Sequence, residues 1–415
     1  MQARVDAVLE QATQAKKVPG VAAVALNSSG DVLYKGLFGT TNLDDPDAPA
    51  VDSSTPTVIF SCTKIVTCIA ALQLLEQGKL SLSDPVEKWL PRIKDIKVVE
   101  KINDDGSPVL RSPKKTMTVL NLMTHTAGFT YDFFDQSTLA YRVHHKQNVG
   151  VYMAQGTDDD FGTPLVFDPG EQYCYGINID YLGFVIEAVS GQRLDEYIEA
   201  YILKPLNMSN TKARLGDAHK QHLCLHLRNP DGSLTANAEL GPGNNPDHYG
   251  GGHYLLSTLD DYSSLLLALL NKGEDLKSGN RILKAETVEK YIFSDQLPTS
   301  ASPDPIGEIP STVPLLTNVG TMLPGVKKGW SCGLMLNHED TPNGRKAGSG
   351  AWAGLGNLYW WIDPAAGKLG LLMSAVLPFF DKDVCYLFDE LERAVYGKDA
   401  ASEPGGKGSN FVMKT

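Results

Sequence analysis

The sequence predicts a mixed α/β fold of the α+β type, in which both ends of the chain contribute to one antiparallel sheet. Runs typical of β-strands lie near the two termini, whereas helical patterns and loops dominate the middle, from about residue 84 to 310. This distribution indicates a helical lobe inserted into a sheet. A cleft between two such lobes is a common position for an active site.

The N-terminal elements are predicted to be a helix and a β-hairpin. An amphipathic helical pattern comes first, and two β-type runs, residues 20–26 and 32–39, then flank a turn that contains Gly30. A short apolar run at residues 56–60 leads into a long helical pattern that ends at Gly78.

The C-terminal elements are predicted to be strands at residues 330–336, 357–363 and 369–376, followed by a helix over about 381–396. In the middle of the chain, helices are expected at residues 179–190, 194–202 and 260–270. Residues 296–328 are rich in Pro, Ser and Thr and predict a long loop.

We expect a single catalytic unit over residues 1–400, followed by a flexible tail, residues 401–415, which is rich in Gly, Ser and Lys. Within the catalytic unit, the sheet lobe would comprise about 1–83 and 325–400. The mainly helical lobe would comprise about 84–324.

The composition argues against several classes of function. The 415 residues are 42% hydrophobic and 21% charged, which is normal for a globular protein with a large core. The formal net charge of −12, with no Lys- or Arg-rich run, argues against nucleic acids and anionic membranes as partners. No run of ~18 apolar residues is present, so no membrane-spanning helix is expected.

The cysteines and the N-terminus predict a cytoplasmic protein without a cofactor. The six cysteines are dispersed, no Cys-x-x-Cys occurs, and the N-terminus lacks the apolar core of a signal peptide. We therefore expect free thiols in a reducing compartment, and neither a disulfide framework nor a metal site.

The tetrapeptide Ser61-Cys62-Thr63-Lys64 is the strongest chemical signal, and it opens the long helical pattern. A helix N-terminus favours the negative charge that develops during attack by a serine, and a lysine three residues later lies on the same helical face. If that amine loses its proton, it can act as the base for the hydroxyl. The alternative is a serine N-cap followed by a surface lysine.

A second signal is the loop-to-helix junction that contains Tyr173 and Tyr175. A tyrosine here can point its hydroxyl into a cleft, and beside a cationic lysine its pKa should fall, which suits a proton shuttle. The alternative is that both tyrosines are packing residues. We interpret Asp180, in the first turn of the next helix, as structural.

Two further segments have weaker signals. Residues 348–357 are rich in small side chains, which allow a ligand to approach the following strand, and a backbone N–H there could serve an oxyanion hole. A glycine-rich hairpin entry is the alternative. His125 has no Gly-x-Ser-x-Gly nucleophile to serve, so we expect a structural role for it.

In combination, these motifs resemble the serine β-lactamase-like superfamily, and the resemblance covers nearly the whole chain. Three motifs agree with it in order and spacing: Ser61-x-x-Lys64, Leu122-x-Thr124-His125-Thr126-x-Gly128, and Tyr175 ahead of Asp180 and Gly183. Residues 175–183 and 348–364 are similar to the branch that contains family VIII carboxylesterases and fungal transesterases of the lovastatin-acyltransferase type.

The resemblance implies a β-lactamase/penicillin-binding-protein-like fold and a set of roles. Ser61 would be the nucleophile, Lys64 the base and Tyr175 the proton shuttle. The backbone N–H groups of Ser61 and Leu355 would form the oxyanion hole.

Two departures from the superfamily's pattern concern the substrate. Penicillin-binding relatives carry Lys-Thr-Gly beside the site, where the lysine helps to bind the β-lactam carboxylate, whereas this chain has Trp352-Ala353-Gly354. The Asn of their Tyr-x-Asn motif would stand at Ile177, but Asn178 comes one residue later. We therefore expect Trp352, Ala353, Gly354 and Asn178 to bind an apolar acyl or ring group rather than a β-lactam or peptidoglycan.

We predict a serine hydrolase that cleaves carboxylic esters through an acyl-enzyme on Ser61. Its substrate would be a small-molecule ester or acyl thioester, with an acyl carrier or coenzyme A as a candidate donor. The alternative is an acyltransferase or transesterase that moves the acyl group to an alcohol of a secondary metabolite. A catalytically silent binding protein on the same fold is the alternative from another class.

Overall fold

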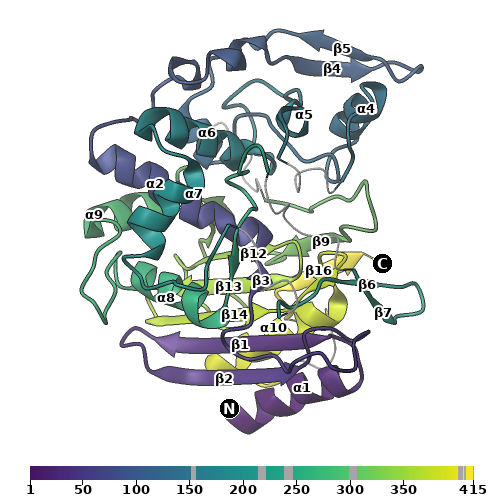
Figure 1. Ribbon diagram of the computed structural model, residues 1–415, viewed down its shortest axis with the longest axis vertical. Helices are drawn as coiled ribbons and strands as arrows, with labels where there is room; N and C mark the ends of the chain where they lie inside the picture. Colours follow the sequence, from purple (N-terminus) through teal and green to yellow (C-terminus); the bar gives the residue numbers. More distant parts are fainter. Residues whose placement is uncertain are drawn as a thin grey trace.

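The chain is built around one seven-stranded antiparallel sheet, and Figure 1 shows both chain ends beside it. The computed structural model describes residues 1–150, 156–213, 221–237, 246–298, 306–400, 405 and 408–414. The strand order is β10-β11-β12-β13-β14-β1-β2. In chain order these strands are β1 Gly20–Asn27, β2 Val32–Gly39, β10 Lys328–Trp330, β11 Met335–Asn337, β12 Gly350–Gly354, β13 Leu358–Asp363 and β14 Lys368–Met373.

The two ends of the chain meet in the pairing of β1 with β14. Ala22 lies opposite Met373, and Asn27 lies opposite Lys368. On its other edge β1 pairs with β2 in an antiparallel hairpin. These pairings confirm the predicted hairpin and the α+β fold in which both ends contribute to one antiparallel sheet.

Helices cover both faces of the sheet, and the alternation of side chains along β13 decides which helix meets which face. Tyr359 and Trp361 contact Phe388 of α10 (Lys382–Val395), with ring centroids 5.3 and 5.4 Å apart. Trp360 points the other way and contacts Tyr262 of α8 (Leu259–Leu270) at 6.3 Å. Helix α1 (Gln2–Gln14) packs beside α10.

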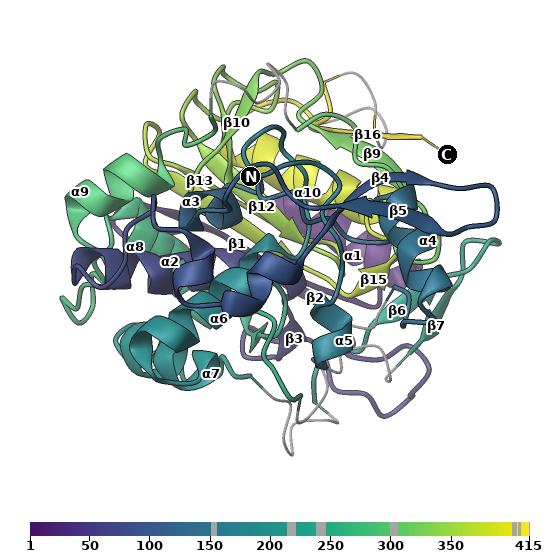
Figure 2. The same cartoon turned by 90° about the horizontal axis from the view of Figure 1, so that it is seen from above.

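The middle of the chain supplies most of the remaining helices, which lie above the sheet in Figure 1. Helix α2 (Thr63–Glu76) packs against α6 (Asn178–Ser190), and Figure 2 shows the two side by side. The other helices are α3 Val119–Met123, α4 Gln136–His144, α5 Asp158–Phe161, α7 Leu194–Ile198 and α9 Ala285–Thr287. Shorter helical turns are η1 Phe60–Cys62, η2 Val86–Lys88, η3 Pro91–Asp95, η5 Glu199–Leu203 and η7 Val288–Ile292.

Small sheets of two or three strands accompany the seven-stranded sheet and its helices, so the middle of the chain is not purely helical. They are β3 Thr57–Val58 with β8 Leu256–Ser257, β4 Val98–Ile102 with β5 Pro108–Arg111, β6 His226–Arg228 between β15 Val376–Leu377 and β7 Leu234–Ala236, and β9 Val319–Met322 with β16 Phe411–Lys414. The division into a sheet lobe and a helical lobe stays a prediction. No helix in the described ranges is long and apolar enough to cross a membrane.

One predicted strand, residues 330–336, is wrong as a continuous element. The chain turns back within it, so that β10 and β11 form a hairpin in which Trp330 lies opposite Met335. The N–H of Ser331 donates to the carbonyl of Leu334 at 2.9 Å, and Gly333 has a φ of +116°, which only glycine adopts readily. An added Cβ there would lie 2.9 Å from Ile65 Cδ1, so the turn also packs tightly on α2.

Two strands lie in segments where the sequence predicts none: β16 in the predicted tail, residues 401–415, and β9 in the predicted loop, residues 296–328. β16 pairs with β9, which places Phe411 opposite Met322. The Asp389 carboxylate of α10 accepts from Ser409 Oγ and from the N–H of Asn410. Residues 401–404, 406–407, 415 and 299–305 lie outside the described part. The strand is therefore fixed by backbone pairing with β9 and, at its start, by polar contacts to α10.

Replacing Phe411 with alanine should lower the free energy of unfolding by about 3–5 kcal/mol, because its buried ring contacts Tyr359, Phe380 and Phe388. Urea unfolding monitored by tryptophan fluorescence measures this change. The neighbouring Val412→Ala is the control: Val412 is 43% exposed, so its loss should be within about 0.5 kcal/mol. A loss of stability for Phe411→Ala as small as that for Val412→Ala would show that the C-terminal strand adds nothing to the core.

Candidate active site

Ser61 and Lys64 meet at the start of α2, as the sequence predicts. Ser61 lies in the turn η1, which leads directly into α2, and Lys64 lies in the first turn of that helix. The Lys64 Nζ atom is 3.1 Å from Ser61 Oγ. Phe60 has a φ of +44°, a strained conformation for a residue other than glycine, and this bend precedes the serine.

The Lys64 side chain is completely buried, and its amine is held by three oxygen atoms. Besides Ser61 Oγ, these are the Tyr131 hydroxyl at 3.0 Å and the Gly252 carbonyl at 2.9 Å. Burial lowers the pKa of Lys64 from 10.5 to about 8, although the Asp180 carboxylate opposes this effect. A substantial fraction of Lys64 is therefore neutral near pH 8 and can accept the Ser61 proton.

Tyr175 lies over the Lys64 amine, with Nζ 4.8 Å from the centre of its ring. Its hydroxyl accepts a hydrogen bond from Trp352 Nε1 at 3.0 Å. The predicted fall in the pKa of Tyr175 is wrong: burial raises this pKa, and the contacts with Ser61 and Trp352 offset only part of the rise. Tyr175 therefore keeps its proton in the resting site.

Tyr131 is a site residue that the sequence analysis missed. It follows α3 in an irregular segment and is buried, and its ring stacks on Phe133 with centroids 4.8 Å apart. Its ring also meets the Tyr175 ring edge-on at 5.7 Å. The segment shows no helical or strand periodicity that would place its hydroxyl on Lys64, and only its aromatic content gives a signal.

His125 packs against Tyr175, and Asn178 contacts His125, but neither residue lines the pocket. The buried His125 ring lies 4.6 Å from the Tyr175 ring, and burial together with Lys64 holds the pKa of His125 well below its usual value. Asn178 Nδ2 lies 3.0 Å from His125 Nδ1 and donates to the carbonyls of Phe129 and Cys174. The structure therefore does not bring Asn178 to the pocket, where it was expected to bind substrate.

A largely apolar pocket opens beside Ser61. Trp352, Ala353, Gly354 and Leu355 all line it, together with Ser61 and Tyr175. The remaining lining residues are Phe60, Tyr131, Phe133, Phe134, His253, Ile309, Met322 and Phe379. Such a surface suits an apolar acyl group. Within the described ranges, no group of three or more His, Cys, Asp and Glu side chains could hold a metal ion.

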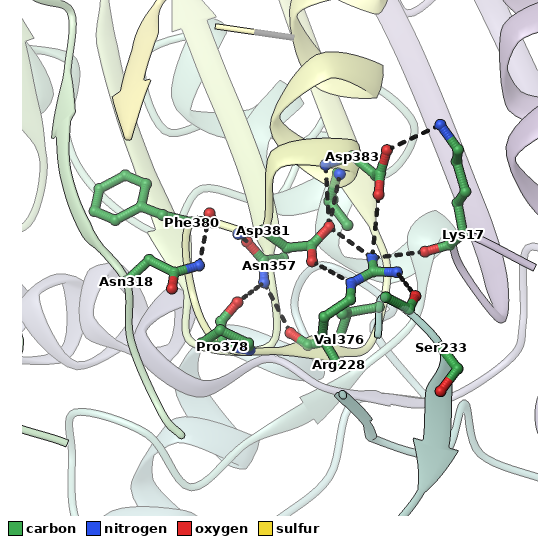
Figure 3. Close-up of polar contacts among 12 residues, drawn as sticks. Lys17, Arg228, Ser233, Asn318, Asn357, Val376, Pro378, Phe380, Asp381 and Asp383 are labelled. Carbon is green, nitrogen blue, oxygen red and sulfur yellow. Dashed lines mark hydrogen bonds and ion pairs between the residues drawn. The ribbon is translucent and has the colours of Figure 1, made fainter. Parts of the chain in front are cut away.

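The turn after β12 is fixed next to Ser61. An added Cβ at Gly354 would lie 2.5 Å from the Ile59 carbonyl, so the end of β12 packs closely on the segment that carries Ser61. Figure 3 shows the Asn357 amide directed at the carbonyls of Val376 and Pro378, to each of which it donates at 2.8 Å. These contacts hold Leu355, whose N–H is the expected second oxyanion donor, beside the loop that carries Phe379.

A cluster of salt bridges fixes the C-terminal end of the loop that carries Phe379. Figure 3 shows the Arg228 guanidinium between Asp381 and Asp383, with Nε 2.8 Å from Asp381 Oδ2. The N–H of Asp381 in turn donates to Asn357 Oδ1 at 3.1 Å. The loop that carries Phe379, part of the pocket wall, is therefore held by a nearly buried ionic cluster at the start of α10.

Relatives of known activity match this chain over almost its whole length. It is 26% identical to ML-236A carboxylate methylbutanoyltransferase mlcH of Penicillium citrinum, over 95% of this chain and 94% of that protein. It is 28% identical to lovastatin esterase of Penicillium rubens, over 95% of this chain and 98% of that protein.

A solved structure agrees with these relatives in fold. Unliganded simvastatin synthase (LovD) from Aspergillus terreus superimposes with a TM-score of 0.82 at 26% identity, over 95% of this chain and 98% of that one. The Beta-lactamase family model matches residues 5–388, and the chain is therefore a member of the beta-lactamase family.

Proposed function

We propose that this protein transfers acyl groups from esters or thioesters through an acyl-enzyme on Ser61, with hydrolysis as its basic reaction. One observation carries the proposal: the buried Lys64 amine lies within hydrogen-bond distance of both Ser61 and Tyr131, beside an apolar pocket. This arrangement supplies a base, a nucleophile and an acyl-binding surface in one place.

In the first step, Ser61 Oγ attacks the carbonyl carbon and its proton moves to neutral Lys64. The N–H groups of Ser61 and Leu355 stabilise the oxyanion. Tyr175 donates a proton to the leaving oxygen or sulfur as the bond to the acyl carbon breaks, and it regains a proton from Lys64. The products are the released alcohol or thiol and an ester on Ser61.

In the second step, an acceptor attacks this ester and gives its proton to Tyr175 as Tyr175 passes its own proton to neutral Lys64. Lys64 then returns that proton to Ser61 Oγ as the bond between Oγ and the acyl carbon breaks. Water as the acceptor gives an acid, and an alcohol gives a new ester. The names of the relatives include both a methylbutanoyltransferase and an esterase, which supports either outcome. A secondary-metabolite alcohol is therefore the second candidate acceptor.

The expected substrate class follows from the side chains that form the pocket wall. Trp352 fills the position at which penicillin-binding relatives carry a lysine, so the pocket offers no cation to a substrate carboxylate from that side. Trp352 packs edge-on against Trp330, with ring centroids 4.5 Å apart, which keeps this wall rigid and apolar. An acyl carrier or coenzyme A as donor, and a cytoplasmic location, remain predictions.

Tyr175→Phe should lower kcat by roughly 10²–10⁴-fold, because it removes the proton donor for the leaving group. The loss in the acylation rate should be larger for an alkyl ester than for a p-nitrophenyl ester, since p-nitrophenolate leaves without a proton. Tyr173→Phe is the matched control, because the Tyr173 hydroxyl has no hydrogen-bond partner among the described residues. A larger loss at Tyr173 than at Tyr175 would contradict the assignment of the shuttle.

Acylated enzyme should release its acyl group to water when no alcohol is present, and to bulky apolar alcohols in addition when they are supplied. The measurement is to load the enzyme with an acyl thioester, add simple and polyketide-like alcohols separately, and determine product masses. Hydrolysis should dominate with simple alcohols. If transfer to an alcohol is much faster than hydrolysis at millimolar acceptor, the protein is a transesterase and the esterase assignment is wrong.

A further inference from the structure

Three consecutive glycines, Gly250–Gly252, pass between α2 and α6 directly behind the catalytic lysine. An added Cβ at Gly252 would lie 2.9 Å from Lys64 Nζ and 2.7 Å from Asp180 Oδ2. At Gly251 it would lie 2.7 Å from the Ile179 carbonyl. None of the three has a positive φ, so the segment requires glycine for space and not for backbone conformation. The missing side chain at Gly252 leaves a narrow gap between an amine and a carboxylate.

Asp180 lies on the far side of this gap, completely buried in the first turn of α6. Its Oδ1 atom accepts from the N–H of Gly252 at 3.1 Å and from His253 Nδ1 at 3.0 Å. The carbonyl of the same Gly252 accepts from Lys64 Nζ. One residue of backbone therefore joins the carboxylate to the amine.

The second carboxylate oxygen, Oδ2, is buried and has no hydrogen-bond partner among the described residues. A buried carboxylate oxygen without a partner destabilises a fold, so structural support alone does not explain this acid. The position of Asp180 in the first turn of α6 predicts a structural acid, and its contacts with Gly252 and His253 also place it beside the catalytic base.

The other titratable groups around Lys64 are uncharged or paired with this acid. Burial raises the pKa values of Cys62, Cys68 and Tyr175, and it lowers that of His125. The Tyr131 hydroxyl accepts a hydrogen bond from the amine, and His253 pairs with Asp180. Of the charged side chains acting on Lys64, Asp180 has the largest effect, and it raises the pKa of the amine.

We propose that Asp180 is a positioning residue that sets the basicity of Lys64. It acts through the backbone of Gly252 and through its charge across the gap at Gly252. This inference rests on the proposed function. Desolvation makes the amine neutral at working pH, but desolvation alone would also make it a weak base. The carboxylate counteracts this weakening. Its hydrogen bond to the N–H of Gly252 also fixes the carbonyl that orients the amine toward Ser61.

Asp180→Asn tests the proposal, because the amide keeps an oxygen that can accept from Gly252 and His253 but removes the charge. In the wild type, kcat/KM should rise with pH through about 8, as Lys64 loses its proton. In the variant this rise should move to lower pH by about 1 unit, and the plateau should fall roughly threefold because the base is weaker. A purely structural role would lower kcat/KM at every pH without moving the rise.

The matched control is Asp261→Asn. Asp261 is also a buried acid in the first turn of a helix, and it accepts from the N–H of Asn210 and from Thr211 Oγ1, away from Lys64. Its profile should keep the wild-type midpoint. Asp180→Glu, which retains the charge, should return the midpoint toward that of the wild type. If Asp180→Asn does not fold, Asp180→Ser is measured in its place, since the smaller side chain leaves room for a water.

The outcomes separate this inference from the proposed function. If Ser61→Ala keeps wild-type activity, the proposed function fails. If activity depends on Ser61 and Lys64 but the Asp180→Asn midpoint coincides with that of the wild type, the inference about Asp180 alone is wrong. A midpoint that moves to higher pH would also overturn it, because removing a nearby negative charge cannot strengthen the base.

Discussion

The site depends on one constraint: the amine of Lys64 must be held in a buried position where it can be neutral. Four segments that are distant in sequence provide this position, namely the turn η1 with Ser61, the segment after α3 with Tyr131, the loop before α6 with Tyr175, and the glycine segment with Gly252. Burial shifts the protonation equilibrium of the amine, and hydrogen bonds fix its direction. The packing of α2 against α6 thus contributes to the buried environment of the amine.

The sheet contributes one wall of the pocket beside Ser61. β12 carries Trp352 through Gly354 into the pocket, and the close approach of Gly354 to Ile59 fixes the strand relative to the segment that carries Ser61. The ionic cluster of Arg228 with Asp381 and the hydrogen bonds of Asn357 hold the adjoining loop. Apolar and aromatic side chains form most of the lining of this pocket.

Local sequence patterns predicted what depends on local geometry. The spacing of Ser61 and Lys64 is three residues on one helix, so their contact follows from helical periodicity. Tyr131 reaches the same amine from an irregular segment 67 residues away, and no periodicity encodes that contact. The pairing of β16 with β9 likewise joins segments that are far apart. The fall expected for the pKa of Tyr175 assumed a charged lysine, whereas burial disfavours the charge on both side chains.

The most direct test of the account is to identify the residue that forms the covalent intermediate. The native enzyme is treated with an alkyl fluorophosphonate, digested, and mapped by mass spectrometry, with the Ser61→Ala variant treated in parallel. If Ser61 is the nucleophile, one modified peptide is found, labelled at Ser61, and the variant carries no label. A label on another residue, or equal labelling of the variant, would contradict the assignment of Ser61 as the nucleophile.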